Sequence, residues 1–145
     1  MHEKNIHNGF IIKPLPPCCG EQLKAPRAAV RHSGDDQHPI FSFQFIDPDF
    51  SITKCQKDDK SNCITKISTL SKMTWQEINE APRHGLGTEI IDRDCLKIKI
   101  PKHVTPDVHI LAFRFSGEKP MLGYREFDVF HIIAFDDKFN AYKHS

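Results

Sequence analysis

The chain has 145 residues, a hydrophobic content of 39% and a formal net charge of +1, which suits one domain with a buried core. Such a nearly neutral chain has no overall attraction for nucleic acid or for an anionic membrane, so binding to either requires a local cationic patch. No apolar run approaches the roughly eighteen residues that cross a bilayer, and residues 10–12 are too short for a signal peptide. We therefore expect a cytoplasmic protein that does not contact the membrane.

The cysteines and histidines predict neither a disulfide framework nor a metal site. The five cysteines are odd in number, and a bridge between the adjacent Cys18 and Cys19 would be strained. The nine histidines include no pair at ligand spacing on an expected helix, and phosphate-loop and zinc-protease motifs are absent. We expect no metal and no cofactor.

The first half of the chain predicts an arm, a strand and two helices. Residues 1–39 carry half of the ten prolines and show no hydrophobic period, which is typical of an extended Pro-rich arm. Phenylalanines alternate with other residues over 41–46, which predicts a strand. The charged residues 57–60 are expected to form a solvated loop before a helix that runs from about Ser61 to Leu70. Thr74 and Glu77 then match a capping box at the start of a second helix, which ends at Pro82.

The second half predicts a succession of strands. Residues 83–87 form a loop whose glycines suit close approach to a phosphate, or simply reverse the chain. Leucine and isoleucine alternate with lysine over 96–100, which favours an edge strand with outward lysines. Residues 108–144 read as consecutive antiparallel strands, of which 129–135 is apolar on both faces and therefore central. Trp75 is expected to anchor a helix on this sheet.

The order of elements defines the predicted fold class. A strand, two helices and a run of strands predict an α+β domain over residues 40–145. Its antiparallel sheet has four to five strands, both helices pack on one face, and the extended arm of residues 1–39 precedes it. The opposite face of the sheet is then open to carry function.

Candidate functional residues fall on that open face. Leu111, Phe113 and Phe115 share one side of their strand, so Arg114 points to the other side. The expected catalytic group gathers there, and consists of Arg114, His131, Tyr142 and His144. The expected RNA-binding residues are Arg83, His84, Tyr124 and Arg125. Because Tyr124 and Arg125 are adjacent in a strand, only one of the two can lie on the open face.

These residue types can cleave RNA without a metal. A base removes the proton of the 2′-hydroxyl, an arginine holds the phosphate, and an acid protonates the leaving oxygen. Structural roles are the alternatives: His131 as a satisfied core histidine, Arg114 paired with Glu126 or Asp128, and Tyr142 packed under a helix.

The element order and several short motifs resemble the RelE/ParE-like toxin superfamily, in its small members encoded on mobile elements. The motifs are Leu70-Ser71-x-x-Thr74-Trp75-x-x-Ile78, Phe113-Arg114-Phe115, Gly123-Tyr124-Arg125, Phe130-His131, Phe135-Asp136 and Tyr142-x-His144. The resemblance covers about residues 40–145. It implies an mRNA endonuclease, acting freely or on the ribosome, with an antitoxin as protein partner. It also implies phosphate binding by Arg114, proton transfer by Tyr142 and His144, and a base at Glu77.

Two departures from the superfamily keep a second hypothesis open. Its nucleases are strongly basic, whereas this chain is nearly neutral and has no lysine-rich helix. The same fold also carries members that bind proteins without catalysis. The alternative is therefore a non-enzymatic protein-interaction module of a mobile element or a host defence system. A cationic hollow that unites Arg114, His131 and Tyr142 favours the nuclease. An Arg114 neutralised by an acid, with His131 buried, favours the interaction module.

Overall fold

The structure is a computed structural model, and it describes residues 6–7, 10–11 and 34–143. The chain divides into two units, Met1–Arg31 and His32–Ser145. In the first unit, β1 (Ile6–His7) pairs with the antiparallel strand β2 (Phe10–Ile11). Most of the predicted Pro-rich arm lies outside the described residues, and its predicted boundary at residue 39 stays a prediction.

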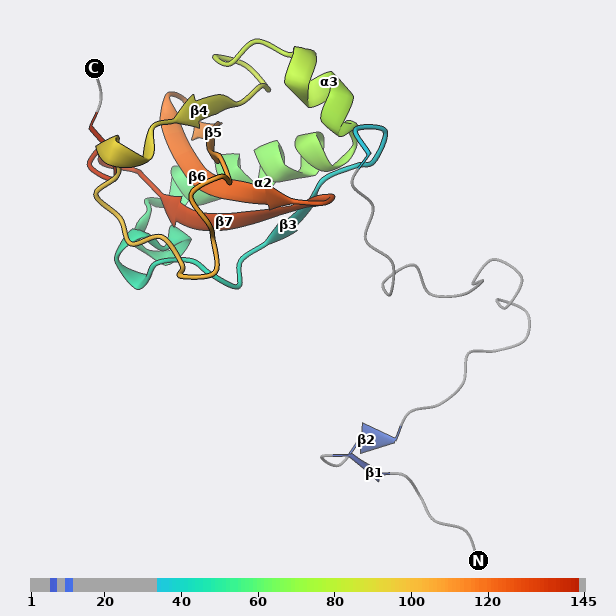
Figure 1. The fold of residues 1–145 in the computed structure, drawn as a ribbon. Helices are drawn as coiled ribbons and strands as arrows, with labels where there is room; N and C mark the ends of the chain where they lie inside the picture. Colours follow the sequence, from blue (N-terminus) through green and yellow to red (C-terminus); the bar gives the residue numbers. More distant parts are fainter. Residues whose placement is uncertain (1–5, 8–9, 12–33, 144–145) are drawn as a thin grey trace, which may run out of the picture. The chain divides into compact units, whose positions relative to one another are not determined.

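The second unit confirms the α+β class (Figure 1). Its five-stranded sheet has the order β3-β7-β6-β5-β4, and its two α-helices are α2 (Lys57–Ser71) and α3 (Trp75–Glu80). The strands are β3 (Ile40–Ser42), β4 (Glu89–Ile91), β5 (Ile110–Ser116), β6 (Lys119–Glu126) and β7 (Val129–Phe135). Short 3-10 helices cover Pro48–Phe50, Ile52–Lys54 and Arg93–Cys95. No helix in these ranges is long and apolar enough to cross a membrane.

The sheet is mostly antiparallel but mixed. β4, β5, β6 and β7 pair in antiparallel fashion, whereas β3 runs parallel to β7, with Ile40 opposite Val129. Helices and other strands lie between β3 and β7 in the chain, so no tight hairpin forces these two strands to run in opposite directions. All seven residues of β7 are buried, which confirms that this strand is central.

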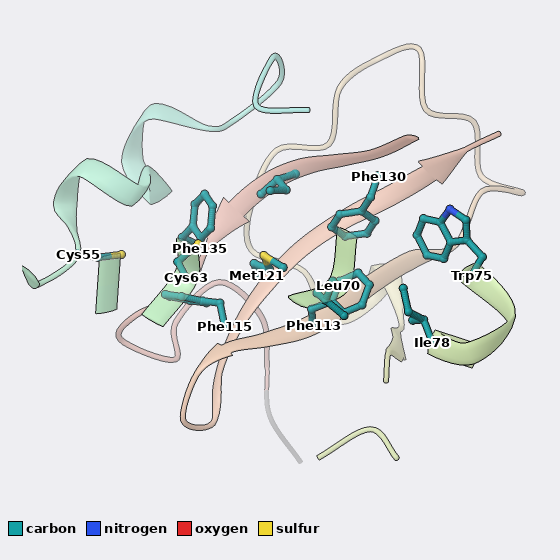
Figure 2. Packing of buried hydrophobic residues seen from close by; sticks show 11 residues of the cluster. Cys55, Cys63, Leu70, Trp75, Ile78, Phe113, Phe115, Met121, Phe130 and Phe135 are labelled. Carbon is teal, nitrogen blue, oxygen red and sulfur yellow. The ribbon is translucent and has the colours of Figure 1, made fainter. Parts of the chain in front are cut away.

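The face that carries the helices holds a dense aromatic core (Figure 2). Trp75 and Phe113 are almost completely buried there, beside Phe130, whose ring centre lies 5.0 Å from that of Phe113. The indole Nε1 of Trp75 donates a hydrogen bond of 3.2 Å to the carbonyl oxygen of Asp128. Trp75 therefore anchors α3 on the sheet, as the sequence predicts. The Thr74 half of the capping box is confirmed, since its side chain accepts from the backbone amide of Glu77, whereas the Glu77 carboxylate accepts from the Thr74 hydroxyl.

The predicted loop over residues 57–60 is wrong, because these residues form the first turn of α2. The sequence places polar residues there, but Asp59 turns inward and is buried. Its carboxylate accepts from Lys119 Nζ at 2.7 Å and from Ser116 Oγ at 2.8 Å. A buried charge is tolerated when it is paired and hydrogen-bonded in this way, so the charged run belongs to the helix.

The second face of the sheet is not open, which corrects the sequence-based expectation. A second core covers it, in which Ile98 and Val104 of the segment after β4, together with Ala141 and Tyr142, pack on β5, β6 and β7. In Figure 1 the yellow to orange segment after β4 crosses the sheet on the side opposite α2. The prediction of an edge strand over 96–100 is wrong, because the alternation reflects apolar side chains packed on the sheet, whose two edge strands are β3 and β4.

Arg93 fixes this irregular cover. Its guanidinium donates to the carbonyl oxygens of Val104, Thr105 and Val108, with the Nη2 to Val108 distance at 2.9 Å. A loop on a buried face has main-chain carbonyls without strand partners, and these require donors from elsewhere. One side chain supplies them here.

Candidate functional site

A polar cavity of about 360 Å³ lies beside β4, between β5 and the end of the described chain. Three cationic side chains face two carboxylates around it, so its lining has one excess positive charge. The lining residues are Arg83, Glu89, Ile90, Ile91, Asp92, Cys95, Arg114, Tyr142 and Lys143. This is the part of the molecule where predicted site residues from distant parts of the chain meet.

Arg114 lies at the inner wall of the cavity, and 11% of its side chain is exposed. Its Nη2 donates to Glu89 Oε2 at 2.8 Å, and its Nε lies 3.7 Å from Glu118 Oε2. The Nε and Nη1 atoms are buried and make no hydrogen bond to any residue in the described ranges. The guanidinium is therefore neutralised by acids of the same chain but retains donors for a further acceptor.

Glu89 joins two of the cations. Its Oε2 receives the hydrogen bond from Arg114, and its Oε1 lies 3.2 Å from Arg83 Nη1. Glu89 stands opposite Ala112 in the β4–β5 ladder, which places its side chain on the face that Arg114 shares. The carboxylate thus acts as a counterion built into the cavity.

Tyr142 closes the cavity from the C-terminal segment. Two main-chain hydrogen bonds hold that segment, from Lys97 N to Ala141 O at 2.8 Å and from Lys143 N to Cys95 O at 2.7 Å. Burial raises the pKa of Tyr142, and its hydrogen bond with Arg114 opposes this rise only in part. The hydroxyl is therefore protonated at neutral pH, so it can donate a proton in a hydrogen bond but cannot serve as a base.

His131 lies elsewhere on the same face. Its ring stacks on Tyr124 with centroids 4.9 Å apart, its Nε2 is 3.3 Å from Glu126 Oε1, and 8% of the residue is exposed. His131 stands opposite Tyr124 on β6, whereas Arg114 stands opposite Pro120. Four residues of strand, roughly 13 Å, separate these two positions along β6. The structure therefore brings Arg114 and Tyr142 together but leaves His131 apart.

The four predicted RNA-binding residues are also divided. Arg83 lines the cavity, and its Nε donates to His84 Nε2 at 3.2 Å. Tyr124 is buried, with its hydroxyl 2.6 Å from His103 Nε2. Arg125 pairs with Asp35 at 2.7 Å, and its guanidinium lies 4.4 Å from the ring centre of Trp75 on the helix side. Tyr124 and Arg125 therefore both make packing contacts within the chain, on opposite faces of the sheet. His144 lies outside the described residues.

Sequence reasoning missed several members of the cavity, above all Glu89 and Lys143. Glu89 immediately precedes the apolar pair Ile90-Ile91, and this short strand was hidden by the stronger alternation over 96–100. Had β4 been recognised as the partner of β5, the charge of Arg114 would have indicated an acid in the neighbouring strand.

Among the described residues, no group of three or more histidines, cysteines or carboxylates has the arrangement of a metal site. The fold and cavity define an α+β protein with a cationic recess at the edge of its second core. No family model, no curated protein and no solved structure matches the chain.

Proposed function

We propose that this chain is a non-enzymatic protein-interaction module. One observation carries the proposal: the arginine expected to hold a phosphate is already paired with Glu89 at 2.8 Å, and the histidine expected to move a proton is buried at a distance from it. A catalytic arginine requires its charge to be available to the substrate. Arg114 instead shares its charge with a carboxylate of its own sheet.

The protonation of the cavity supports the same conclusion. A tyrosine hydroxyl is ordinarily protonated at neutral pH, and burial raises the pKa of Tyr142 further, so Tyr142 cannot remove the 2′-hydroxyl proton. No histidine lines the cavity within the described ranges. Of the carboxylates that line the cavity, Glu89 is already paired with Arg83 and Arg114, so the cavity is better suited to binding and orienting a ligand than to removing a proton from RNA.

The test compares growth and RNA cleavage on expression in a bacterial host. An interaction module leaves growth and cellular mRNA unchanged, and purified chain leaves RNA intact with and without ribosomes. Crosslinking in the native host then recovers a protein whose yield falls in Arg83→Glu, which reverses the charge of a residue that lines the cavity, but not in Lys72→Glu on the exposed end of α2. Growth arrest by the unaltered chain contradicts the proposal.

A second candidate is a RelE-like toxin, a metal-independent endoribonuclease that cleaves mRNA and is held inactive by an antitoxin. The observation that favours it is the shared cavity of Arg114 and Tyr142, the two residues to which the resemblance assigns phosphate binding and proton transfer. Its test is growth arrest with mRNA cleavage that disappears in Arg114→Ala, His144→Ala. Arrest that persists in this double variant would exclude the site.

A further inference from the structure

We propose that the cavity beside β4 is a binding site for a single carboxylate group, donated by an aspartate or glutamate side chain of an extended segment in a partner protein. The inference rests on the proposed function and names the chemistry that its partner presents. Arg114 provides the main donors, while Tyr142 and Lys143 lie around the same space.

The hydrogen-bond inventory of Arg114 points to an absent acceptor. Nη2 is used by Glu89, whereas Nε and Nη1 are buried without a hydrogen bond to any described residue. Buried donors that stay unpaired are unfavourable, and a guanidinium N–H group donates a strong, charge-assisted hydrogen bond to a carboxylate oxygen. The cavity that Arg114 lines is about 360 Å³ in volume and has room for such a group.

The charges select a single anion over a polyanion. Arg83, Arg114 and Lys143 face Glu89 and Asp92 across the cavity, which leaves one positive charge for a ligand to neutralise. A further acid, the exposed Glu118, lies 3.7 Å from Arg114. A nucleic acid strand would bring further phosphates close to these acids, which would repel them. One carboxylate from a protein neutralises the single excess positive charge and adds no other negative charge nearby.

The adjoining strand suits an extended partner segment. β4 is the last strand of the sheet, and β5 is its only strand neighbour among the described residues. Ile90 is 61% exposed at its centre, between two residues that line the cavity. An extended segment that adds to this edge places alternate side chains beside the cavity, which is a common form of peptide recognition.

The experiment follows the Arg114 side-chain resonances of the full chain by nuclear magnetic resonance at low salt. The probes are sodium acetate, dimethyl phosphate, and blocked alanine pentapeptides with glutamate or glutamine at the centre. We expect saturable shifts with acetate and with the glutamate peptide, and affinity for the peptide about tenfold higher because it also contacts β4. The glutamine peptide should leave the resonances unchanged. Dimethyl phosphate that binds as well as acetate would overturn the carboxylate assignment in favour of nucleic acid.

Variants separate binding from folding. Glu89→Gln removes the internal counterion, so its affinity for acetate should rise by about tenfold, whereas Glu80→Gln on α3 should leave affinity unchanged. Arg114→Lys keeps the charge but loses the planar guanidinium donors, and should bind several times more weakly, as followed by the backbone amide resonances of β4. If Arg114→Lys fails to fold, Glu89→Gln still tests the inference. If the ion pair between Arg114 and Glu89 were purely structural, breaking it would not raise the affinity of the chain for acetate.

The outcomes distinguish this inference from the proposed function. Shifts with acetate and the glutamate peptide, combined with growth arrest on expression, would support the carboxylate site and contradict the proposal of a non-enzymatic interaction module. Crosslinking to a partner that does not depend on Arg83, combined with no shift at Arg114 for any probe, would support the interaction module and overturn the carboxylate site. Shifts with acetate that match those of the peptide in affinity would assign the site to a small free acid and overturn the protein segment.

Discussion

The two faces of one sheet are covered in different ways. On the first face, α2 and α3 satisfy their own main-chain hydrogen bonds and contribute mostly apolar side chains, among them Trp75. On the second face, an irregular segment provides Ile98 and Val104 but depends on Arg93 for its carbonyl oxygens. A helical cover needs few polar side chains near the core, whereas an irregular cover needs them there. The charged cavity accordingly lies at the edge of the second face.

The largest expected effect separates the two cores within one strand. Ile132 and Ile133 are neighbours in β7 and equally buried, but Ile132 faces the helices and Ile133 faces the irregular cover. We expect Ile132→Ala to lower the free energy of unfolding by about 4 kcal/mol, and Ile133→Ala by about 2 kcal/mol, because the irregular cover can relax into the space. Chemical denaturation followed by Trp75 fluorescence measures both. Equal losses would mean that the two covers are equally rigid.

The next effect is acid sensitivity on the helix face. Hydrogen bonds from Lys119 and Ser116 hold the pKa of Asp59 below its ordinary value of 3.8. This contribution to stability is fully present above pH 3.8 and is lost as the pH falls below it toward the lowered pKa of the folded state. The melting temperature of the unaltered chain should therefore fall more steeply in this range than that of Asp59→Asn. The exposed neighbour Asp58→Asn should follow the unaltered chain, and parallel curves for all three would contradict the prediction.

The difference between the faces also explains how far the sequence could be interpreted. Period-two alternation in β5 and the capping box at Thr74 are local patterns, and both placed their side chains correctly. The alternation over 96–100 was equally clear, but it belongs to a segment that packs on a sheet without joining it. Local periodicity reports which side chains are buried and not what buries them. The proximity of Glu89 to Arg114 depends on the pairing of β4 with β5, and local sequence patterns do not reveal which strands pair.

A smaller effect should expose the irregular cover directly. Arg93→Ala removes a charged donor shared by the carbonyl oxygens of Val104, Thr105 and Val108, and should cost about 2 kcal/mol. Amide hydrogen exchange should become faster over residues 96–108, while α2 keeps its protection. Arg93→Lys keeps a charged donor group, so its free energy of unfolding should lie between those of the unaltered chain and Arg93→Ala. A uniform increase over both faces would show that the cover does not open as a separate unit.

The smallest effect is the corresponding loss on the helix face. Thr74 accepts from the Glu77 amide and donates to its carboxylate at 3.2 Å, so Thr74→Ala removes one cap and should cost about 1 kcal/mol. Faster exchange should stay within α3, because the remaining turn keeps its own main-chain bonds and Trp75 keeps its place in the core. Thr74→Ser retains the hydroxyl and should be nearly neutral. Thr74→Ala could instead lower the free energy of unfolding as much as Arg93→Ala and accelerate amide exchange across the sheet. The helix-covered face would then depend on single polar side chains as strongly as the irregular cover does.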